Sequence, residues 1–317
     1  MFLLGSAGRA VAAATPLSGS LDVSIIATTV PRVEDENDQD NVIDIKMDLL
    51  ATVNGKSSLL GNFSGWVTYT LNLTTGHFSG TMVKVAANGD QLFEDITGSF
   101  TDASGTNSIG HFTITQGTGR FKNATGGGDF TGVFPSPVQG KITFDGNCNF
   151  SASNRARSPS ANSSAYQATG QVIFSNIQNG LLLGQPVPYV GVSSSTLTGL
   201  GVQTGSIQAT TPLSVVGPGK LAFEGVVGPH PVLGTNVHVI TTAKGDIHST
   251  WTAVFTLQYD ASGTVTFSGD GQFTITGGTG IYRNATGNFR TLFTTEAVAQ
   301  TSDTASAKVN QSGNIAR

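Results

Sequence analysis

Charged residues and cysteine are scarce in this chain. Only 11% of its 317 residues are Asp, Glu, Lys or Arg, and Cys148 is its one cysteine. A single thiol cannot form an intrachain disulfide, so such cross-links are excluded as the source of the fold's stability. The chain is nevertheless long enough for two domains, each able to bury a core without disulfides or metals.

Basic clusters and long apolar runs are also missing. The formal net charge is -4, and lysine and arginine gather nowhere along the sequence. Nucleic-acid binding needs clustered positive charge to meet the phosphates. A membrane-spanning helix needs about 20 consecutive apolar residues, which no stretch approaches. We therefore expect neither a nucleic-acid partner nor a membrane span.

Turn-forming and strand-forming residues are abundant instead. The chain holds 41 glycines and much Thr and Ser, and its apolar residues come in short runs, not in helical stripes. This texture is typical of an all-β protein with many turns. The pair Asn88-Gly89, between the runs TMVKVA and DQLFEDI, is a strong hairpin signal and predicts a two-residue type I′ turn.

One phrase is written twice. HFTITQGTGRFKNATG, residues 111–126, and QFTITGGTGIYRNATG, residues 272–287, are identical at eleven of sixteen positions with a constant offset of 161. Two further pairs of segments correspond in the same order along the chain. Asn-Gly-Asp at 88–90 aligns with Lys-Gly-Asp at 244–246, and KITFDGNC at 141–148 aligns with KVNQSGNI at 308–315. Three ordered landmarks indicate duplication of a whole domain of about 130 to 150 residues.

The repeated phrase reads as a strand, a glycine turn and a second strand. Apolar residues alternate with threonine in FTIT, which predicts one buried face, and the glycines supply backbone conformations or close approaches that side chains obstruct. About eight such antiparallel strands per copy would close into a barrel and remove exposed edges. The residues that define the motif are Phe112, Ile114, Gly117, Gly119 and Gly126, with Phe273, Ile275, Gly278, Gly280 and Gly287 in the second copy.

Two stretches of the first copy carry a family resemblance. AANGDQLF, residues 86–93, followed by GHFTITQGTGRFKNATGGGDFTG, residues 110–132, resembles the pattern of secreted bacterial proteins related to the allene oxide cyclase and dirigent barrels. It covers residues 61–134 and, less fully, 235–293. The resemblance implies an eight-stranded, antiparallel, calycin-like barrel in tandem duplication. It brings no catalytic residue with it, because the shared glycines build the fold and one fold hosts many functions.

Domain boundaries follow from composition. Residues 1–16 combine an apolar stretch with small residues at Ala12, Ala13 and Ala14 and are interpreted as a signal segment, with a frayed Ala-rich terminus as the alternative. Residues 151–166 are rich in Ser, Asn and Ala and predict a flexible linker. The expected barrels are therefore residues 17–150 and 167–317, in an exported protein.

Candidate chemistry is sparse. Asp35, Asn37, Asp38 and Asp40 place oxygen ligands at the close spacing that calcium needs, but the glycine and distal glutamate of an EF-hand loop are missing. A hydrated hairpin tip explains them as well, so we expect no metal and no organic cofactor. Asp246 and His248 would lie on one face of a strand, yet the first copy aligns Leu92 with His248, which speaks against a shared acid–base pair.

Two functions remain open. The first is a secreted, non-enzymatic pair of barrels with a binding or extracellular structural role, which binds a small hydrophobic ligand or associates with itself. The second is a cyclase or isomerase of the allene oxide cyclase type, which holds a reactive hydrophobic substrate inside a barrel and needs few charged groups. A cavity of several hundred Å³ would favour binding of a ligand or substrate, whereas filled barrels would favour a structural role.

Overall fold

The fold is described from a computed structural model. The structure describes residues 14–34, 44–150, 165–180, 183–195, 197–299 and 301–316. The weak calcium candidates at positions 35–40, most of the signal segment and most of the linker lie outside these ranges.

The first half of the chain forms a closed barrel. Eight strands follow one another around it in antiparallel order, and β1 closes the ring by pairing with both β9 and β3. A short strand, β2, extends the sheet beyond β3. The elements are β1 (Thr15–Thr28), β2 (Arg32–Glu34), β3 (Asp44–Ser57), β4 (Gly61–Asn72), β5 (His77–Ala86), β6 (Gln91–Phe100), β7 (Asn107–Gly117), the 3₁₀ turn η1 (Gly119–Phe121), β8 (Thr125–Ser136) and β9 (Gln139–Asn149).

The second half forms another ring of antiparallel strands. β10 pairs with β11 on one side and with β20 on the other. On the far side of the ring, two short strands, β14 and β15, each pair with both β12 and β16. β16 also pairs with β17, which closes the ring. The elements are β10 (Ala165–Ser175), α1 (Ile177–Gly180), β11 (Pro186–Ser195), β12 (Gly199–Ala209), β13 (Ser214–Gly217), β14 (Lys220–Val227), β15 (His238–Thr242), β16 (Gly245–Tyr259), β17 (Thr264–Gly278), η2 (Gly280–Tyr282), β18 (Thr286–Thr295), β19 (Val298–Ala299) and β20 (Thr304–Ala316). The prediction of an all-β chain with two tandem antiparallel barrels is confirmed.

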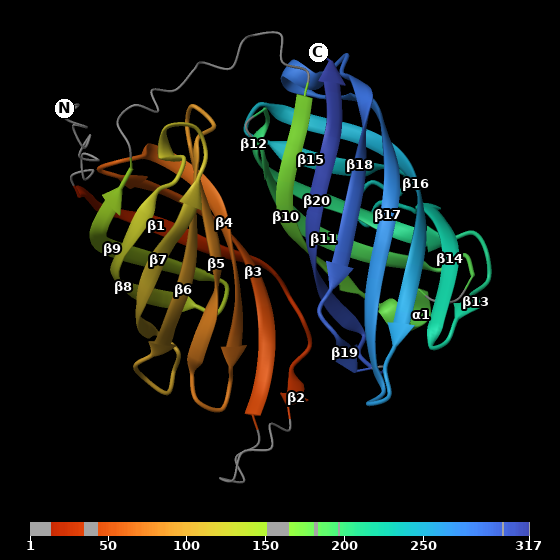
Figure 1. The fold of residues 1–317 in the computed structure, drawn as a ribbon, viewed down its shortest axis with the longest axis horizontal. Helices are drawn as coiled ribbons and strands as arrows, with labels where there is room; N and C mark the ends of the chain where they lie inside the picture. Colours follow the sequence, from red (N-terminus) through yellow and green to blue (C-terminus); the bar gives the residue numbers. More distant parts are fainter. Residues whose placement is uncertain are drawn as a thin grey trace, which may run out of the picture.

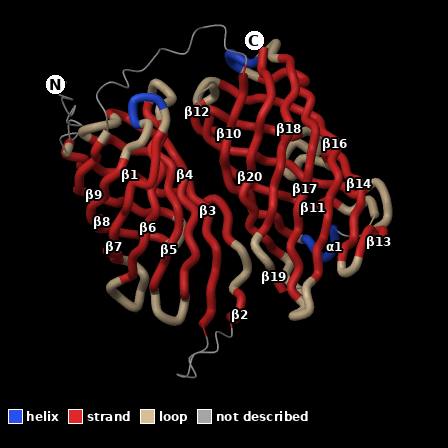
Figure 2. The backbone as a smooth tube through the Cα atoms, in the orientation of Figure 1, coloured by secondary structure: helices blue, strands red, loops and turns tan. Residues whose placement is uncertain are grey.

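The repeated phrase builds the same corner in both barrels. η1 and η2 each lie at the upper end of a barrel (Figure 2), and Phe121 and Tyr282 bury their rings completely beneath them. Gly119 and Gly280 adopt φ values of 55° and 56°, in the left-handed region that favours glycine. A Cβ on Gly119 would lie 1.7 Å from an Asp90 carboxylate oxygen. Glycine is therefore required by both conformation and space.

The hairpin after β5 differs from the sequence prediction. The backbone N–H of Ala86 donates to the carbonyl of Asp90, which encloses three residues, and Gly89 alone among them has positive φ, 87°. A type I′ turn needs positive φ at both central residues, so that prediction was wrong. The geometry is the three-residue hairpin whose last loop residue is left-handed.

The two barrels pack side by side through an apolar interface (Figure 1). The first barrel contributes outward-facing residues of β3, β4 and β5, and the second contributes residues of β10 and β11. The buried members are Leu50, Trp66, Val83, Val85, Ile173 and Val192. The indole N–H of Trp66 also donates to the hydroxyl of Ser194 at 3.5 Å, across the interface. Burial of this apolar area stabilises the docked arrangement.

Candidate functional site

The lower end of the first barrel, opposite η1, opens into a cleft of about 800 Å³. Three turns surround it, at residues 73–76, 101–106 and 137–138, which connect successive pairs of strands from β4 to β9. Its apolar wall residues come from β1, β3, β4, β8 and the first turn, and include Ile25, Met47, Leu49, Leu71, Leu73 and Pro135. We call this cleft the mouth. Barrel mouths of this size are common places for small-molecule sites.

One turn of the mouth is held by a saturated carboxylate. Asp102 accepts hydrogen bonds from the Ser104 hydroxyl at 2.6 Å and from the backbone N–H groups of Thr106 and Asn107 at 2.8 and 2.7 Å. These donors, the Ser104 hydroxyl first, hold the pKa of Asp102 well below its usual range. The carboxylate therefore serves the turn and has few lone pairs left for a ligand.

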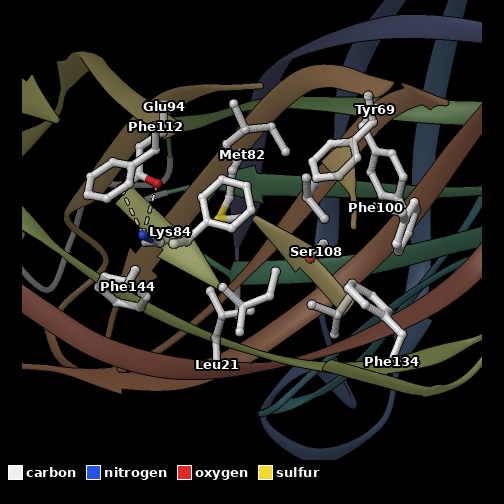
Figure 3. Close-up of a pocket in the computed structure, with 16 residues that line it drawn as sticks. Leu21, Tyr69, Met82, Lys84, Glu94, Phe100, Ser108, Phe112, Phe134 and Phe144 are labelled. Atoms are coloured by element: carbon white, nitrogen blue, oxygen red, sulfur yellow. Dashed lines mark hydrogen bonds and ion pairs between the residues drawn. The ribbon is translucent and has the colours of Figure 1, made fainter. Parts of the chain in front are cut away.

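An aromatic layer forms the floor of the mouth. Phe100 and Phe134 meet edge to face with ring centroids 5.6 Å apart, and Phe78 lies 5.7 Å from Phe100 and 5.6 Å from Tyr69. Figure 3 shows Tyr69, Phe100 and Phe134 gathered at one end of the barrel interior. Burial raises the pKa of the Tyr69 phenol well above its ordinary value, so its hydroxyl is neutral.

A smaller cavity lies behind this layer. The volume of this cavity, measured as the space open to the centre of a water molecule, is only about 40 Å³. Ser108 lies on its wall, 2% exposed, and the Ser108 hydroxyl has no hydrogen-bond partner among the residues that the structure describes. We call this space the inner cavity. It is too small for a whole hydrophobic ligand, since ligand pockets commonly measure about 300 to 1,000 Å³.

A buried ion pair occupies the end of the inner cavity away from the mouth. The ammonium of Lys84 lies 2.9 Å and 2.8 Å from the two carboxylate oxygens of Glu94, and each residue is 2% exposed. The same ammonium lies 3.9 Å from the ring centroid of Phe144 and 5.1 Å from that of Phe112 (Figure 3). The partnered charges and the aromatic faces offset part of the cost of removing both ions from water.

Cys148 lies buried in the same barrel. Burial, and then the charge of Glu94, raise the pKa of the Cys148 thiol to about 11. A thiol with such a pKa is protonated near neutral pH, and the thiolate is the nucleophilic form. In this barrel the buried Cys148 side chain is therefore part of the hydrophobic core.

The second barrel has one apolar and one neutral polar residue at the positions of the ion pair. Its register against the repeated motif puts Ile240 and Ser249 where the first barrel has Lys84 and Glu94. The Ser249 hydroxyl is fully buried and has no hydrogen-bond partner in the described part of the chain. Of the two barrels, only the first therefore carries the ion pair at these positions.

A histidine–tyrosine pair lies inside the second barrel. Nδ1 of His238 is 2.7 Å from the Tyr189 hydroxyl. Both side chains line a cavity with a volume of about 40 Å³, measured as for the inner cavity of the first barrel. Burial, and then the charge of His230, lower the pKa of His238 to about 3, so its imidazole is neutral at ordinary pH. Ile177, the first residue of α1, packs against the hydrophobic core of the second barrel, and α1 lies away from the η2 end of that barrel (Figure 2).

The candidates singled out in the sequence fall in separate places. The four residues of the weak calcium site lie outside the described residues, and no group of three or more His, Cys, Asp or Glu side chains suited to a metal occurs within them. Asp246 accepts a hydrogen bond from the Thr279 hydroxyl at 3.1 Å, and His248 is half-buried. The backbone N–H of Gln91 donates to the hydroxyl of Thr118, and the backbone N–H of Asp246 donates to the equivalent hydroxyl of Thr279. Gln91 and Asp246 are therefore counterparts, and two residues further along Phe93 is the counterpart of His248. The alignment of Leu92 with His248 was wrong by one residue.

The motif residues support the barrels and do not line the mouth. Phe112 and Phe273 are 2% and 7% exposed, and Ile114 and Ile275 are 2% and 5% exposed. Gly126 and Gly287 have φ values of 144° and 132°. Their shared role is to close the η1 and η2 end of each barrel. The mouth, the inner cavity and the ion pair were not identified from the sequence.

Comparisons with known proteins add little. No protein-family model matches the chain, and no curated protein matches it. Among solved structures, intact Ap-TbpB with its N and C lobes aligns with 96% of this chain and 78% of its own, at 9% identity and a TM-score of 0.15. That score is too low to bear on fold or function. Within the described part of the chain, no helix is long and apolar enough to cross a bilayer.

Proposed function

We propose that this chain is a non-enzymatic binding protein that holds a small hydrophobic ligand in the mouth of its first barrel. The observation that carries the proposal is an open cleft of about 800 Å³ with an aromatic floor, whose walls combine apolar strand residues with polar residues of the surrounding turns. Burial of a ligand's apolar surface there provides the driving force, at roughly 25 cal/mol per Å² before the costs of association.

By the criterion given above, the nearly filled interiors favour a structural role for the barrels themselves, and the open mouth is the feature that supports binding. A water centre reaches only about 40 Å³ inside either barrel, so neither interior accommodates a lipid-sized molecule without rearrangement. The barrels act as rigid scaffolds, and the turns at residues 73–76 and 101–106 shape the site. Binding sites of this kind, on loops held by a rigid sheet, are common.

We further propose that the protein is exported and works outside the cell. The small residues near the N-terminus support a signal segment, and the low content of charge and the lack of paired cysteines are compatible with either side of a membrane. Fusion of residues 1–20 to a reporter enzyme tests this directly: we expect the reporter in the medium, and retention inside the cell would contradict export.

A second candidate is the cyclase or isomerase reading. The observation that favours it is the pairing of Lys84 with Glu94 on the wall of the inner cavity, within an otherwise apolar barrel. An acid and a base in such a place could act on a reactive substrate whose conformation the barrel restricts. Incubation with an unsaturated fatty-acid epoxide separates the candidates, because conversion by the parent chain would favour turnover; loss of conversion in Glu94→Gln counts for this candidate only if circular dichroism shows that the variant is folded.

The binding proposal is tested with a matched pair of leucines. Leu73 lines the mouth and is 45% exposed, whereas Leu292 lies on the second barrel and is 42% exposed. We expect the neutral dye Nile red to bind the full chain, and we expect Leu73→Asp to weaken that binding at least about tenfold, because a charge in an apolar contact costs desolvation. Leu292→Asp should leave it unchanged. Equal effects of the two variants, or no binding at all, would reject the mouth as the site.

A further inference from the structure

The inner cavity contains a hydroxyl group that lacks a partner. Ser108 is 2% exposed, and its neighbours across β6 and β8 are Phe100 and Gly132. Its hydroxyl has no hydrogen-bond partner in the described residues. Buried hydroxyl groups are nearly always paired in folded proteins, with protein, water or ligand, because an unpaired one loses its bonds to water without replacement.

The inner cavity, whose wall includes Ser108, lies directly behind the floor of the mouth. Phe100 and Phe134 line both spaces, and Figure 3 shows Ser108 next to them, on the side toward the middle of the inner cavity. A water molecule needs roughly 10 to 15 Å³ of space measured at its centre. The 40 Å³ available therefore accommodates the polar end of a ligand whose apolar body remains in the mouth.

The charges on the cavity wall restrict what that polar end can be. Lys84 is the one cationic side chain among the residues that line the inner cavity, and both carboxylate oxygens of Glu94 lie within 2.9 Å of its ammonium. A ligand carboxylate would enter without a cation of its own and close to a second carboxylate. The desolvation of a charge without a partner disfavours it strongly.

We propose that Ser108 is the head-group residue of the ligand site, and that the ligand is a neutral, mainly apolar molecule with a terminal hydroxyl or carbonyl oxygen. The Phe100 and Phe134 rings, which meet edge to face, must separate to admit the head, which then exchanges a hydrogen bond with the Ser108 hydroxyl, a group that both donates and accepts. The apolar body lies against the aromatic layer. This inference rests on the proposed function of the mouth.

The test measures displacement of Nile red from the full chain by 1-octanol, octane and octanoate. Ser108→Ala should weaken the binding of 1-octanol about fivefold, the worth of one neutral hydrogen bond, and leave octane unchanged. Ser249→Ala is the matched control, since Ser249 also has a buried hydroxyl without a partner in the described residues, but lies in the second barrel. It should change neither affinity. Octanoate at pH 8 should bind at least about tenfold more weakly than 1-octanol.

The outcomes separate this inference from the proposed function. If none of the three probes displaces Nile red, or if displacement is insensitive to Leu73→Asp, the mouth is not the site and the proposed function fails. If octane and 1-octanol bind in a manner that depends on Leu73 but Ser108→Ala weakens neither, or if octanoate binds most tightly, the mouth stands and the head-group assignment is overturned. Ser108→Gly, which removes the same hydroxyl, repeats the measurement should the alanine variant be poorly folded.

Discussion

Removal of one member of the Lys84–Glu94 pair should destabilise the first barrel severely. The ammonium and the carboxylate oxygens are 2.8 and 2.9 Å apart, and each side chain is almost completely buried. Glu94→Leu leaves a buried ammonium without a counterion, and Lys84→Met leaves a buried carboxylate. Breaking a buried pair in this way costs about 3 to 5 kcal/mol. A single domain is commonly stable by only about 5 to 15 kcal/mol.

Removal of both members should cost far less. Two apolar side chains of similar volume do not need to be desolvated as ions, and such exchanges are often neutral or stabilising by about 1 to 4 kcal/mol. The second barrel supplies a precedent, because Ile240 and Ser249 stand at these positions and the ring still closes. The double variant Lys84→Met with Glu94→Leu should therefore be within about 2 kcal/mol of the parent, which gives a coupling free energy of more than about 3 kcal/mol.

The assay is urea denaturation followed by tryptophan fluorescence. The chain has two tryptophans, so a Trp251→Phe background leaves Trp66, at the interface of the barrels, as the reporter for all four members of the cycle. The reasoning would be refuted if either single variant cost less than about 1 kcal/mol, or if the double variant lost the sum of the two single losses.

Three further predictions concern other parts of the molecule. Folding lowers the pKa of His238 from 6.5 to about 3, so between these pH values the unfolded chain binds more protons than the folded chain. The free energy of unfolding of the second barrel should therefore fall by about 1.4 kcal/mol per pH unit as the pH drops below 6.5. His238→Met, which copies Met82 of the first barrel, should remove this pH dependence in urea titrations from pH 7 to 4. Gly119→Ala should cost at least about 1 kcal/mol more than Gly105→Ala, because both glycines have positive φ but only at Gly119 does a Cβ meet the carboxylate of the preceding hairpin; equal losses in thermal melts would contradict this. Trp66→Ser should separate the unfolding of the two barrels into two calorimetric transitions, since it opens a hole in their apolar interface; a single unchanged transition would show that the interface contributes little.

Strand alternation and the glycine motif were sufficient to predict the barrels. Local pattern determines which face of a strand is buried when the other face is polar, as in FTIT. The strand β5 breaks this rule, because its Val83 and Val85 pack at the interface while Met82 and Lys84 point inward. A strand buried on both faces shows no alternation, so neither the docked barrels nor an inward lysine could be predicted from it.

One signal in the sequence was available and overlooked. Asp-Ala-Ser-Gly-Thr occurs at 102–106 and again at 260–264, an offset of 158. Asp260 accepts hydrogen bonds from Ser262 and Thr264 as Asp102 does from Ser104 and Thr106. This landmark would have placed a turn between two strands in each copy and located the end of the barrel that carries the mouth. The depth of the mouth, by contrast, depends on how Phe100 and Phe134 pack, which only the three-dimensional structure shows.

The most direct test of a ligand site in the mouth is methyl NMR of the full chain during titration with 1-octanol. Labelled methyl groups of Met47, Leu71 and Leu73 line the mouth, and Leu257 is buried in the second barrel. We predict saturable shifts at the three mouth residues and none at Leu257. Shifts centred on the second barrel, or no saturable shift at the mouth, would contradict the account.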